Sequence, residues 1–89
     1  MTQKSATIIV YGTNWCPDCV RAKQFLERHH IPYEWVDVEK DHVAMAYIQR
    51  VNAGLRVVPT ILFPDGSTLS EPSNAELAEK VQSNTTCLS

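Results

Sequence analysis

The sequence predicts one α/β sandwich domain over residues 1–89, with the element order βαβαββα and a four-stranded mixed sheet that carries helices on both faces. Short apolar runs alternate with segments in which apolar residues recur at helical spacing, which is the first reason for this prediction. The second is a Pro-Asp-Gly-Ser turn at 64–67, typical of a hairpin between two short strands. The chain has 89 residues, 44% of them hydrophobic, which suffices for one core but not for two.

The first three elements predict a right-handed parallel unit of strand, helix and strand. Residues 7–11 lack polar alternation and are rich in β-branched residues, so we expect the central strand of the sheet there. Residues 20–29 have helical spacing and precede a proline at position 32, which ends a helix. The stripe expected to be buried consists of Ala22, Phe25, Leu26 and His29. Residues 33–38, rich in aromatic residues and valine, predict the second strand.

The second half of the chain predicts a helix, a hairpin and a last helix. Asp41 can cap the first of these helices. Its apolar residues keep helical spacing at Ala44, Ile48, Val51 and Leu55. Residues 56–63 predict a third strand opened by a proline, and residues 68–70 predict its short antiparallel partner. The Ser-Asn-Ala-Glu segment at 73–76 is a capping box and predicts the start of the last helix.

Two cysteines, Cys16 and Cys19, stand at the junction between the first strand and the first helix. Pro17 fits the first helical position, which makes Cys16 the expected N-cap. A sulfur atom there faces free backbone N–H groups and the positive end of the helix dipole, so the thiolate is the favoured form. Cys19 lies one turn further on, within reach of Cys16. We therefore expect Cys16 to attack a disulfide and Cys19 to resolve the mixed disulfide that results.

A Cys-x-x-Cys pair can also be half of a zinc or iron–sulfur site, which needs two further ligands. The rest of the chain offers only Cys87 and three scattered histidines, without a second Cys-x-x-Cys or Cys-x-x-His. The pattern therefore favours redox chemistry over a structural metal, and we predict no metal site. The polar residues 84–89 predict a flexible tail, in which Cys87 is either a thiol without function or the source of an intermolecular disulfide.

Composition excludes several other classes of protein. The net charge is -2, so we expect no nucleic-acid partner and no attraction to anionic membranes. Apolar runs are too short for a signal peptide or a membrane span. We therefore expect a cytoplasmic protein, and in that compartment an isolated Cys-x-x-Cys pair is more often catalytic than structural. We also expect a monomer.

The motifs resemble those of a known superfamily. Cys-Pro-Asp-Cys at 16–19 after a first strand, with Val58-Pro59 at the opening of the third, resembles the thioredoxin superfamily, and the short chain resembles a glutaredoxin within it. A narrower resemblance is to the mycoredoxin-like branch of the glutaredoxins. It rests on Trp15, on the segment 51–60, on Asp-Gly-Ser-Thr-Leu at 65–69 and on Pro-Ser at 72–73. The resemblance covers nearly the whole chain. It implies the thioredoxin/glutaredoxin-like sandwich and a thiol–disulfide oxidoreductase that carries electrons through its dithiol.

The resemblance also implies roles for single residues. Cys16 would be the nucleophile and Cys19 the resolving thiol. The Val58–Pro59 bond would be cis, with the Val58 backbone facing the sulfur atoms, where it can pair with an extended substrate. Trp15 would offer an aromatic wall beside the sulfurs, with ordinary partly buried packing as the alternative. Arg56 would lie near this groove and take a substrate carboxylate, with a plain solvated charge as the alternative.

The expected substrates are disulfide-containing proteins or mixed disulfides, and the expected co-substrate is a low-molecular-weight thiol, glutathione or mycothiol, or a reductase protein. No tightly bound cofactor is expected. Glutathione-using glutaredoxins usually carry a lysine where this chain has Thr13, and a Gly-Gly-x-Asp segment where it has residues 70–73.

The alternative function is a dimeric iron–sulfur-binding module, against which Pro17 counts. Asp18 stands where glutaredoxins commonly have tyrosine or phenylalanine. Its negative charge near the Cys16 thiolate predicts a lower, more reducing potential for the Cys16–Cys19 dithiol/disulfide couple.

Overall fold

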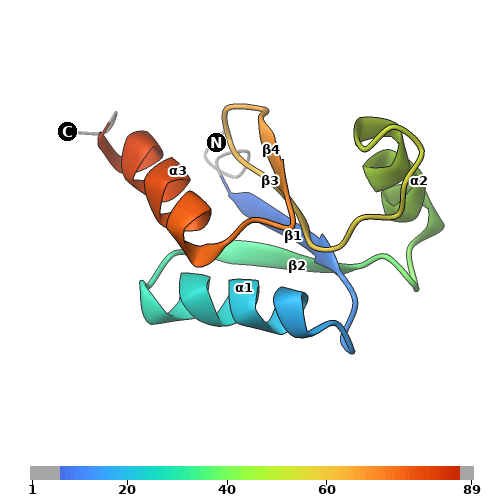
Figure 1. Cartoon of the computed structure of the whole chain (residues 1–89), viewed down its shortest axis with the longest axis horizontal. Coiled ribbons are helices and arrows are strands. Elements are labelled where there is room, and N and C mark those ends of the chain that lie inside the picture. Colours follow the sequence, from blue (N-terminus) through green and yellow to red (C-terminus); the bar gives the residue numbers. More distant parts are fainter. Residues whose placement is uncertain (1–6, 87–89) are drawn as a thin grey trace.

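The computed structural model describes residues 7–86, and within this range the elements follow the predicted order βαβαββα (Figure 1). The strands are β1 (Ile8–Gly12), β2 (Tyr33–Asp37), β3 (Thr60–Leu62) and β4 (Thr68–Ser70). The helices are α1 (Pro17–Arg28), α2 (His42–Val51) and α3 (Asn74–Thr86). The fold is the predicted thioredoxin/glutaredoxin-like sandwich with a four-stranded mixed sheet.

The sheet has the strand order β2-β1-β3-β4, so the first strand of the chain is central, as predicted. Strand β1 pairs in parallel with β2 and antiparallel with β3, which itself pairs antiparallel with β4. The end of β1, the end of β2 and the start of β3 therefore lie at the same edge of the sheet. The segment with the two cysteines leaves β1 at that edge.

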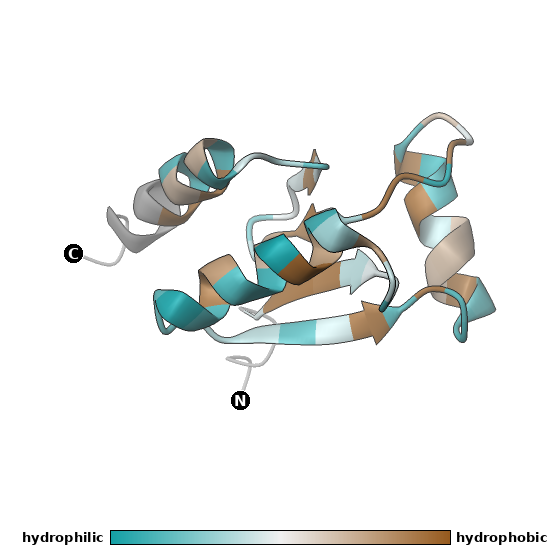
Figure 2. Ribbon diagram, turned by 60° about the horizontal axis from the view of Figure 1, so that its bottom comes forward, coloured by the Kyte–Doolittle hydropathy of each residue, from teal (hydrophilic) through white to brown (hydrophobic). Residues whose placement is uncertain are grey.

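Helices cover both faces of the sheet, and each face has its own core. Helices α1 and α3 share one core with residues of β1 and with Ile61 of β3. In Figure 1 both helices lie to the left of α2. This core consists of Ile8, Val10, Ala22, Phe25, Leu26, Ile61, Phe63 and Leu77. Helix α2 covers the other face with the smaller cluster Val38, Ala44 and Ile48. The hydropathy colours of Figure 2 show hydrophobic stretches on the strands and a mixed surface on α1.

Both predicted side-chain caps are confirmed. The Asp41 carboxylate accepts a 3.0 Å hydrogen bond from the Ala44 N–H at the start of α2. At the start of α3, the Ser73 hydroxyl accepts from the Glu76 N–H at 3.1 Å, and the Glu76 carboxylate accepts from the Ser73 N–H at 2.8 Å. These short-range bonds fix where the two helices begin.

The third strand is shorter than predicted, because residues 56–59 form a loop and β3 begins only at Thr60. Pro59 has no N–H to give to a sheet. The carbonyls before it are also used elsewhere: Val57 C=O accepts a 2.7 Å hydrogen bond from the Thr60 hydroxyl, and Val58 C=O faces Cys16. Local side-chain bonding thus ends the sheet early and turns this loop towards the cysteines.

A partly buried polar network joins the same loop to α2 and β4. The Thr60 hydroxyl accepts a 3.1 Å hydrogen bond from the Asn52 amide, which also donates to Ile48 C=O at 2.7 Å. The Ser70 hydroxyl on β4 donates to the Asn52 side-chain oxygen. Because Thr60 is fully buried and its hydroxyl is satisfied on both sides, the segment between α2 and β3 has a defined position.

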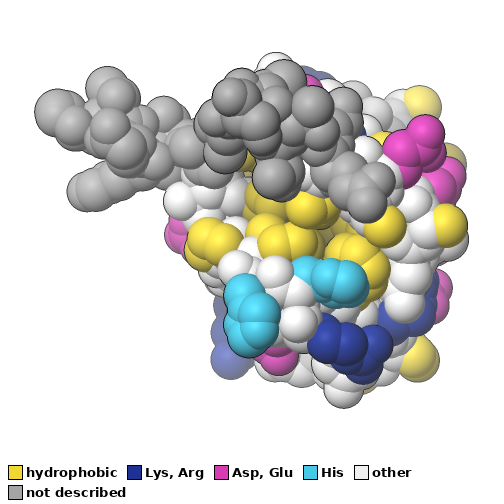
Figure 3. All heavy atoms as spheres, turned by 90° about the vertical axis from the view of Figure 1, so that its left-hand side faces the viewer, with side chains coloured by type: hydrophobic (Ala, Val, Ile, Leu, Met, Phe, Trp, Pro, Cys, Tyr) yellow, Lys and Arg dark blue, Asp and Glu magenta, His cyan; other side chains and the backbone are white. Residues whose placement is uncertain are grey.

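Two expectations at helix ends need correction. His29, predicted to lie in the buried stripe of α1, is exposed, because α1 ends at Arg28 and His29 is its C-cap with its ring 4.4 Å from that of Phe25. Histidine side chains reach the surface at this end of the molecule (Figure 3). Helix α3 continues to Thr86, so residues 84–86 of the expected tail are helical. Cys87 and the rest of the expected tail lie outside the described residues.

Candidate active site

The two cysteines are held by the start of α1. Pro17 is the first residue of α1 and Cys16 is its N-cap, with extended φ and ψ of -82° and 118°, as predicted. The Cys16 N–H donates to Thr13 C=O at 3.4 Å, and Cys16 C=O accepts the first helical bond, from Val20 N–H, at 3.1 Å. The Cys16 sulfur makes no capping bond to the helix.

Both cysteines are free thiols in the structure. Cys16 is 7% exposed and Cys19 is fully buried. Burial raises the pKa of Cys19 to about 12, and the hydrogen bond with the Cys16 thiol adds to this effect, while a hydrogen bond from the Thr13 backbone opposes it. Cys19 therefore keeps its proton at neutral pH, while Cys16 retains a small exposed fraction of 7%.

The close approach of Cys19 depends on Gly12, the last residue of β1. A Cβ atom at this position would lie 2.5 Å from the Cys19 sulfur and 2.9 Å from the Trp35 ring. Both distances are well below van der Waals contact, so only glycine allows the buried thiol to pack against the strand. The sequence analysis missed this role; the position of a glycine between an apolar strand and Cys-x-x-Cys was the available signal.

The loop before β3 forms one side of the cysteine site. The Val58–Pro59 bond is cis, as the family resemblance implied. The Cys16 thiol lies 3.9 Å from Val58 C=O and donates towards it. Pro59 is buried and its own C=O accepts a 2.8 Å hydrogen bond from the Glu71 N–H, while Val58 is half-buried. The Val58 carbonyl therefore lies beside the Cys16 sulfur.

The loop before α1 is tied to the residues that follow β2. Trp15 is 68% exposed, and its indole N–H donates a 2.8 Å hydrogen bond to the Glu39 carboxylate. The Asn14 amide donates to the Asp37 carboxylate at 3.4 Å. The exposed indole shows that the alternative of partly buried packing for Trp15 is wrong. Nothing in the sequence indicated Glu39 as its partner, because the two residues are 24 positions apart.

The charge of Asp18 is partly balanced in the structure. Its carboxylate lies 3.3 Å from the Arg21 guanidinium, which also donates to Pro72 C=O at 3.3 Å and to Asn74 at 2.9 Å. Asp18 still adds to the raised pKa of Cys19, after the larger effects of burial and of Cys16. The sequence analysis considered the carboxylate alone and did not anticipate the arginine.

Two other positions differ in what they offer to a ligand. Arg56 is exposed, and it makes no hydrogen bond or ion pair to another residue in the part of the chain that the structure describes. Thr13 is 3% exposed, and its hydroxyl finds no partner among residues 7–86. The side chain that replaces the glutathione-binding lysine therefore points into the protein.

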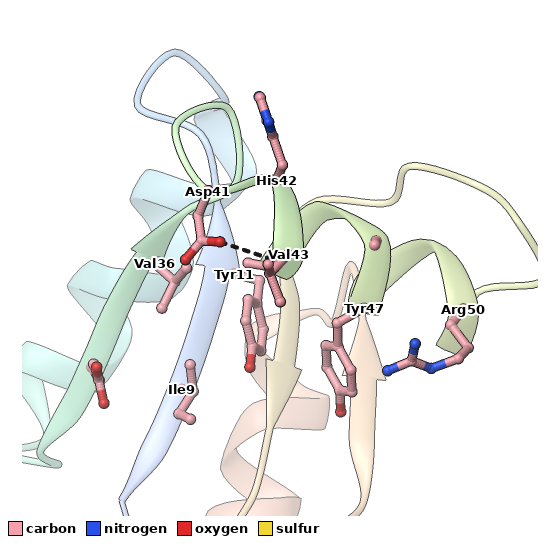
Figure 4. A pocket seen from close by; sticks show the side chains of 11 residues that line it. Ile9, Tyr11, Val36, Asp41, His42, Val43, Tyr47 and Arg50 are labelled. Carbon is pink, nitrogen blue, oxygen red and sulfur yellow. Dashed lines mark hydrogen bonds between the residues drawn. The ribbon is translucent and has the colours of Figure 1, made fainter.

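An open groove of about 650 Å³ lies between α2 and the β1–β2 half of the sheet, and no cysteine lines it. Figure 4 shows Tyr11 and Tyr47 side by side in it, with their rings 5.2 Å apart, and Arg50 at one end. The two cysteines of the candidate site lie outside this groove, at the start of α1. Among residues 7–86, no group of three His, Cys, Asp or Glu side chains is placed to hold a metal ion. Nor does any helix in this range have the length and apolarity to cross a membrane.

The raised pKa of Cys19 predicts selective alkylation. In a reduced Cys87→Ser variant, we expect iodoacetamide at pH 7 to label Cys16 and to leave Cys19 unlabelled. The thiolate fraction of Cys19 should grow about tenfold for each pH unit below 12. Fragment mass spectrometry of the peptide with both cysteines reads the two sites separately. Equal labelling of the two sulfurs at pH 7 would contradict this expectation.

The same pKa has a consequence for stability. The folded-state value of about 12 lies above the ordinary value of 9.0, so burial of protonated Cys19 favours the reduced fold below pH 9. This contribution is lost as the pH rises from 9 towards 12, where the unfolded state releases the proton first. The reduced protein should therefore lose stability over this range.

Known proteins share this sequence and fold. The sequence model of the Glutaredoxin family matches residues 8–67. A Mycobacterium tuberculosis protein provisionally named a glutaredoxin is 42% identical over 77 residues, which cover 86% of this chain and 92% of that protein. Mycoredoxin 1 of Corynebacterium glutamicum is 32% identical over 77 residues, covering 86% of this chain and 95% of its own length.

Solved structures agree with these relatives. The thioredoxin-like protein BC3987 superposes with a TM-score of 0.72 at 30% identity, covering 82% of this chain and 97% of its own. The glutaredoxin of Archaeoglobus fulgidus has the same TM-score, 0.72, at 23% identity, with coverage of 86% and 87%. The second likeness concerns the fold alone.

Proposed function

This chain belongs to the glutaredoxin family, in its mycoredoxin-like branch, and is a thiol–disulfide oxidoreductase; from this premise we propose that it reduces protein or mixed disulfides through the dithiol of Cys16 and Cys19. The observation that supports the proposal is an N-cap thiol followed, one helical turn later, by a buried thiol that keeps its proton. Cys16 is the nucleophile because its sulfur lies at the positive end of α1. Cys19 is the resolving thiol.

The proposed reaction has two steps. The Cys16 thiolate attacks one sulfur of the substrate disulfide, so that a Cys16–substrate bond forms and the substrate S–S bond breaks, releasing one substrate thiol. Cys19 then loses its proton and attacks the Cys16 sulfur, which forms the Cys16–Cys19 disulfide and releases the second thiol. Two electrons pass from the dithiol to the substrate, and the reductant returns them.

We propose that the substrate is contacted on both sides of Cys16. The Val58 N–H and C=O pair with an extended backbone that passes over Cys16, next to Pro59. Trp15 provides an exposed aromatic surface on the other side. Arg56, exposed in the loop before Val58, takes a carboxylate of the substrate or co-substrate. Pro17 fixes the helix start that holds the nucleophile.

The co-substrate is a low-molecular-weight thiol, and we propose mycothiol ahead of glutathione. Family membership implies such a reductant without identifying it, and a reductase protein can take the same place. Thr13 is buried where glutathione-using relatives place a lysine, so it offers no charge to a glutathione carboxylate. We further propose that residues 1–89 act as one cytoplasmic monomeric domain.

A coupled assay tests this function. NADPH oxidation is followed with a glutathionylated or mycothiolated peptide and three reductants: glutathione with its reductase, mycothiol with its reductase, and thioredoxin reductase. We expect turnover with mycothiol and little with glutathione. Turnover with none of the three, together with a Cys16–Cys19 pair that dithiothreitol does not titrate as one two-electron couple, would overturn the proposal. A brown, iron-containing protein after anaerobic purification would instead support the iron–sulfur module.

Asp18 is predicted to lower the redox potential. Asp18→Asn removes a negative charge that disfavours the thiolates, so the reduced form should gain stability and the potential should rise by about 10–30 mV. Arg21 keeps the change small, because it already balances part of this charge at 3.3 Å. The measurement is a redox titration of both proteins against dithiothreitol. An unchanged or lower potential in the variant would disprove the prediction.

A further inference from the structure

We propose that Glu39 is a positioning residue for substrate binding, because its carboxylate binds the exposed indole of Trp15, the residue next to Cys16. The hydrogen bond from the indole N–H to Glu39 measures 2.8 Å. The inference rests on the proposed function of Cys16 as the nucleophile. It adds a residue that does not itself touch the reacting sulfur.

Because Trp15 is exposed, packing alone does not fix the orientation of its indole. With 68% of its surface exposed, the indole has few packing neighbours to select one orientation. An exposed side chain that is free to rotate must lose this freedom when a substrate binds, which weakens binding. One hydrogen bond to a carboxylate selects an orientation before the substrate arrives.

Glu39 is itself held in place. The Glu39 N–H donates to the Asp37 carboxylate at 3.0 Å, and the same aspartate accepts from the Asn14 amide at 3.4 Å. The Val38 N–H donates to Gly12 C=O at 3.0 Å. These bonds join the ends of β1 and β2 and the loop before α1, so the backbone of Glu39 is held beside Trp15.

The strand order places Glu39 and the loop that contains Val58 on opposite sides of Cys16. Because the order is β2-β1-β3-β4, residues after β2 lie on one side of the β1 end and residues before β3 lie on the other. Cys16 follows β1 and therefore lies between them. Val58 forms the β3 side, 3.9 Å from the sulfur, and Trp15 with Glu39 forms the β2 side. A substrate strand that pairs with Val58 presents its neighbouring side chain to the indole.

The favoured substrate therefore carries an apolar or aromatic side chain next to its disulfide cysteine. The test compares two peptide mixed disulfides that differ only in Phe or Gly at the position beside the cysteine. Glu39→Ala should raise the KM for the Phe peptide about three- to tenfold, with kcat unchanged, and should change the Gly peptide less than about twofold. Glu39→Gln keeps an acceptor oxygen and should behave as wild type. Glu34→Ala, which removes an exposed carboxylate within β2, is the matched charge control.

A double-mutant cycle shows whether the effect passes through the indole. Trp15→Phe keeps a ring but removes the N–H donor, so it should raise the KM as Glu39→Ala does. In the Trp15→Phe background, Glu39→Ala should then add nothing. An equal further rise in that background, or an unchanged KM in Glu39→Ala itself, would overturn the proposal.

Nuclear magnetic resonance supplies a readout that does not depend on activity. The chain has two tryptophans, and the signal lost in Trp15→Phe assigns the Trp15 indole N–H. Glu39→Ala should move this signal upfield and speed its exchange with solvent, while Glu39→Gln and Glu34→Ala should leave it in place. An unmoved signal in Glu39→Ala would contradict the anchor. Inactive wild-type protein with a normal indole signal would instead count against the proposed function alone.

Discussion

Cys16→Ser is expected to abolish disulfide reduction, lowering the rate on every disulfide substrate by on the order of a thousandfold or more. The hydroxyl of serine does not ionise at neutral pH, and no other thiol among residues 7–86 stands at a helix start. The helix should form as before, because the Cys16 sulfur makes no capping bond that serine would remove.

Cys19→Ser is expected to separate two classes of substrate. A protein disulfide needs the second thiol to release the trapped intermediate, so turnover on it should fall as far as in Cys16→Ser. A peptide mixed disulfide can be resolved by the small-thiol reductant, so part of that activity should remain.

Both variants are compared with wild type in a Cys87→Ser background, so that the thiol outside the described residues does not contribute. Full activity of Cys19→Ser on both substrates would assign the monothiol route, and any activity of Cys16→Ser above background would remove Cys16 from the role of nucleophile.

Gly12→Ala is the second change with a large expected effect. The added methyl group would lie 2.5 Å from the Cys19 sulfur and 2.9 Å from the Trp35 ring, and both belong to packed parts of the molecule. We expect the free energy of unfolding to fall by about 1–3 kcal/mol, the range for overpacking a core. The displaced Cys19 should also resolve mixed disulfides more slowly.

The measurements for Gly12→Ala are urea unfolding and the rate of Cys16–Cys19 disulfide closure in a preformed mixed disulfide. Gly66→Ala is a suitable control, because Gly66 has a φ of 90° and an added Cβ there would meet nothing within 4 Å. That variant should lose about 1–2 kcal/mol through backbone strain while its disulfide closes at the wild-type rate. Normal closure in Gly12→Ala would show that Cys19 is not placed by Gly12.

Short-range chemistry made much of the fold predictable. The caps at Asp41 and Ser73, the proline at the start of α1 and the turn at 64–67 each depend on residues within three or four positions of one another. The parallel pairing of β1 with β2 followed from the handedness of such units. The third strand is shorter than predicted because the Val57 and Val58 carbonyls face Thr60 and Cys16, and neither contact can be read from apolar spacing.

The sequence by itself determined where α1 begins, which thiol stands at its N-cap and which thiol follows one turn later, because these depend on a proline and a spacing of three residues. Only the tertiary structure decided what surrounds them. Gly12, Glu39 and Val58 come from three strand ends that the sheet order brings to one edge. No local pattern encodes contacts across 24 or 42 positions, since they arise only when the strands pair.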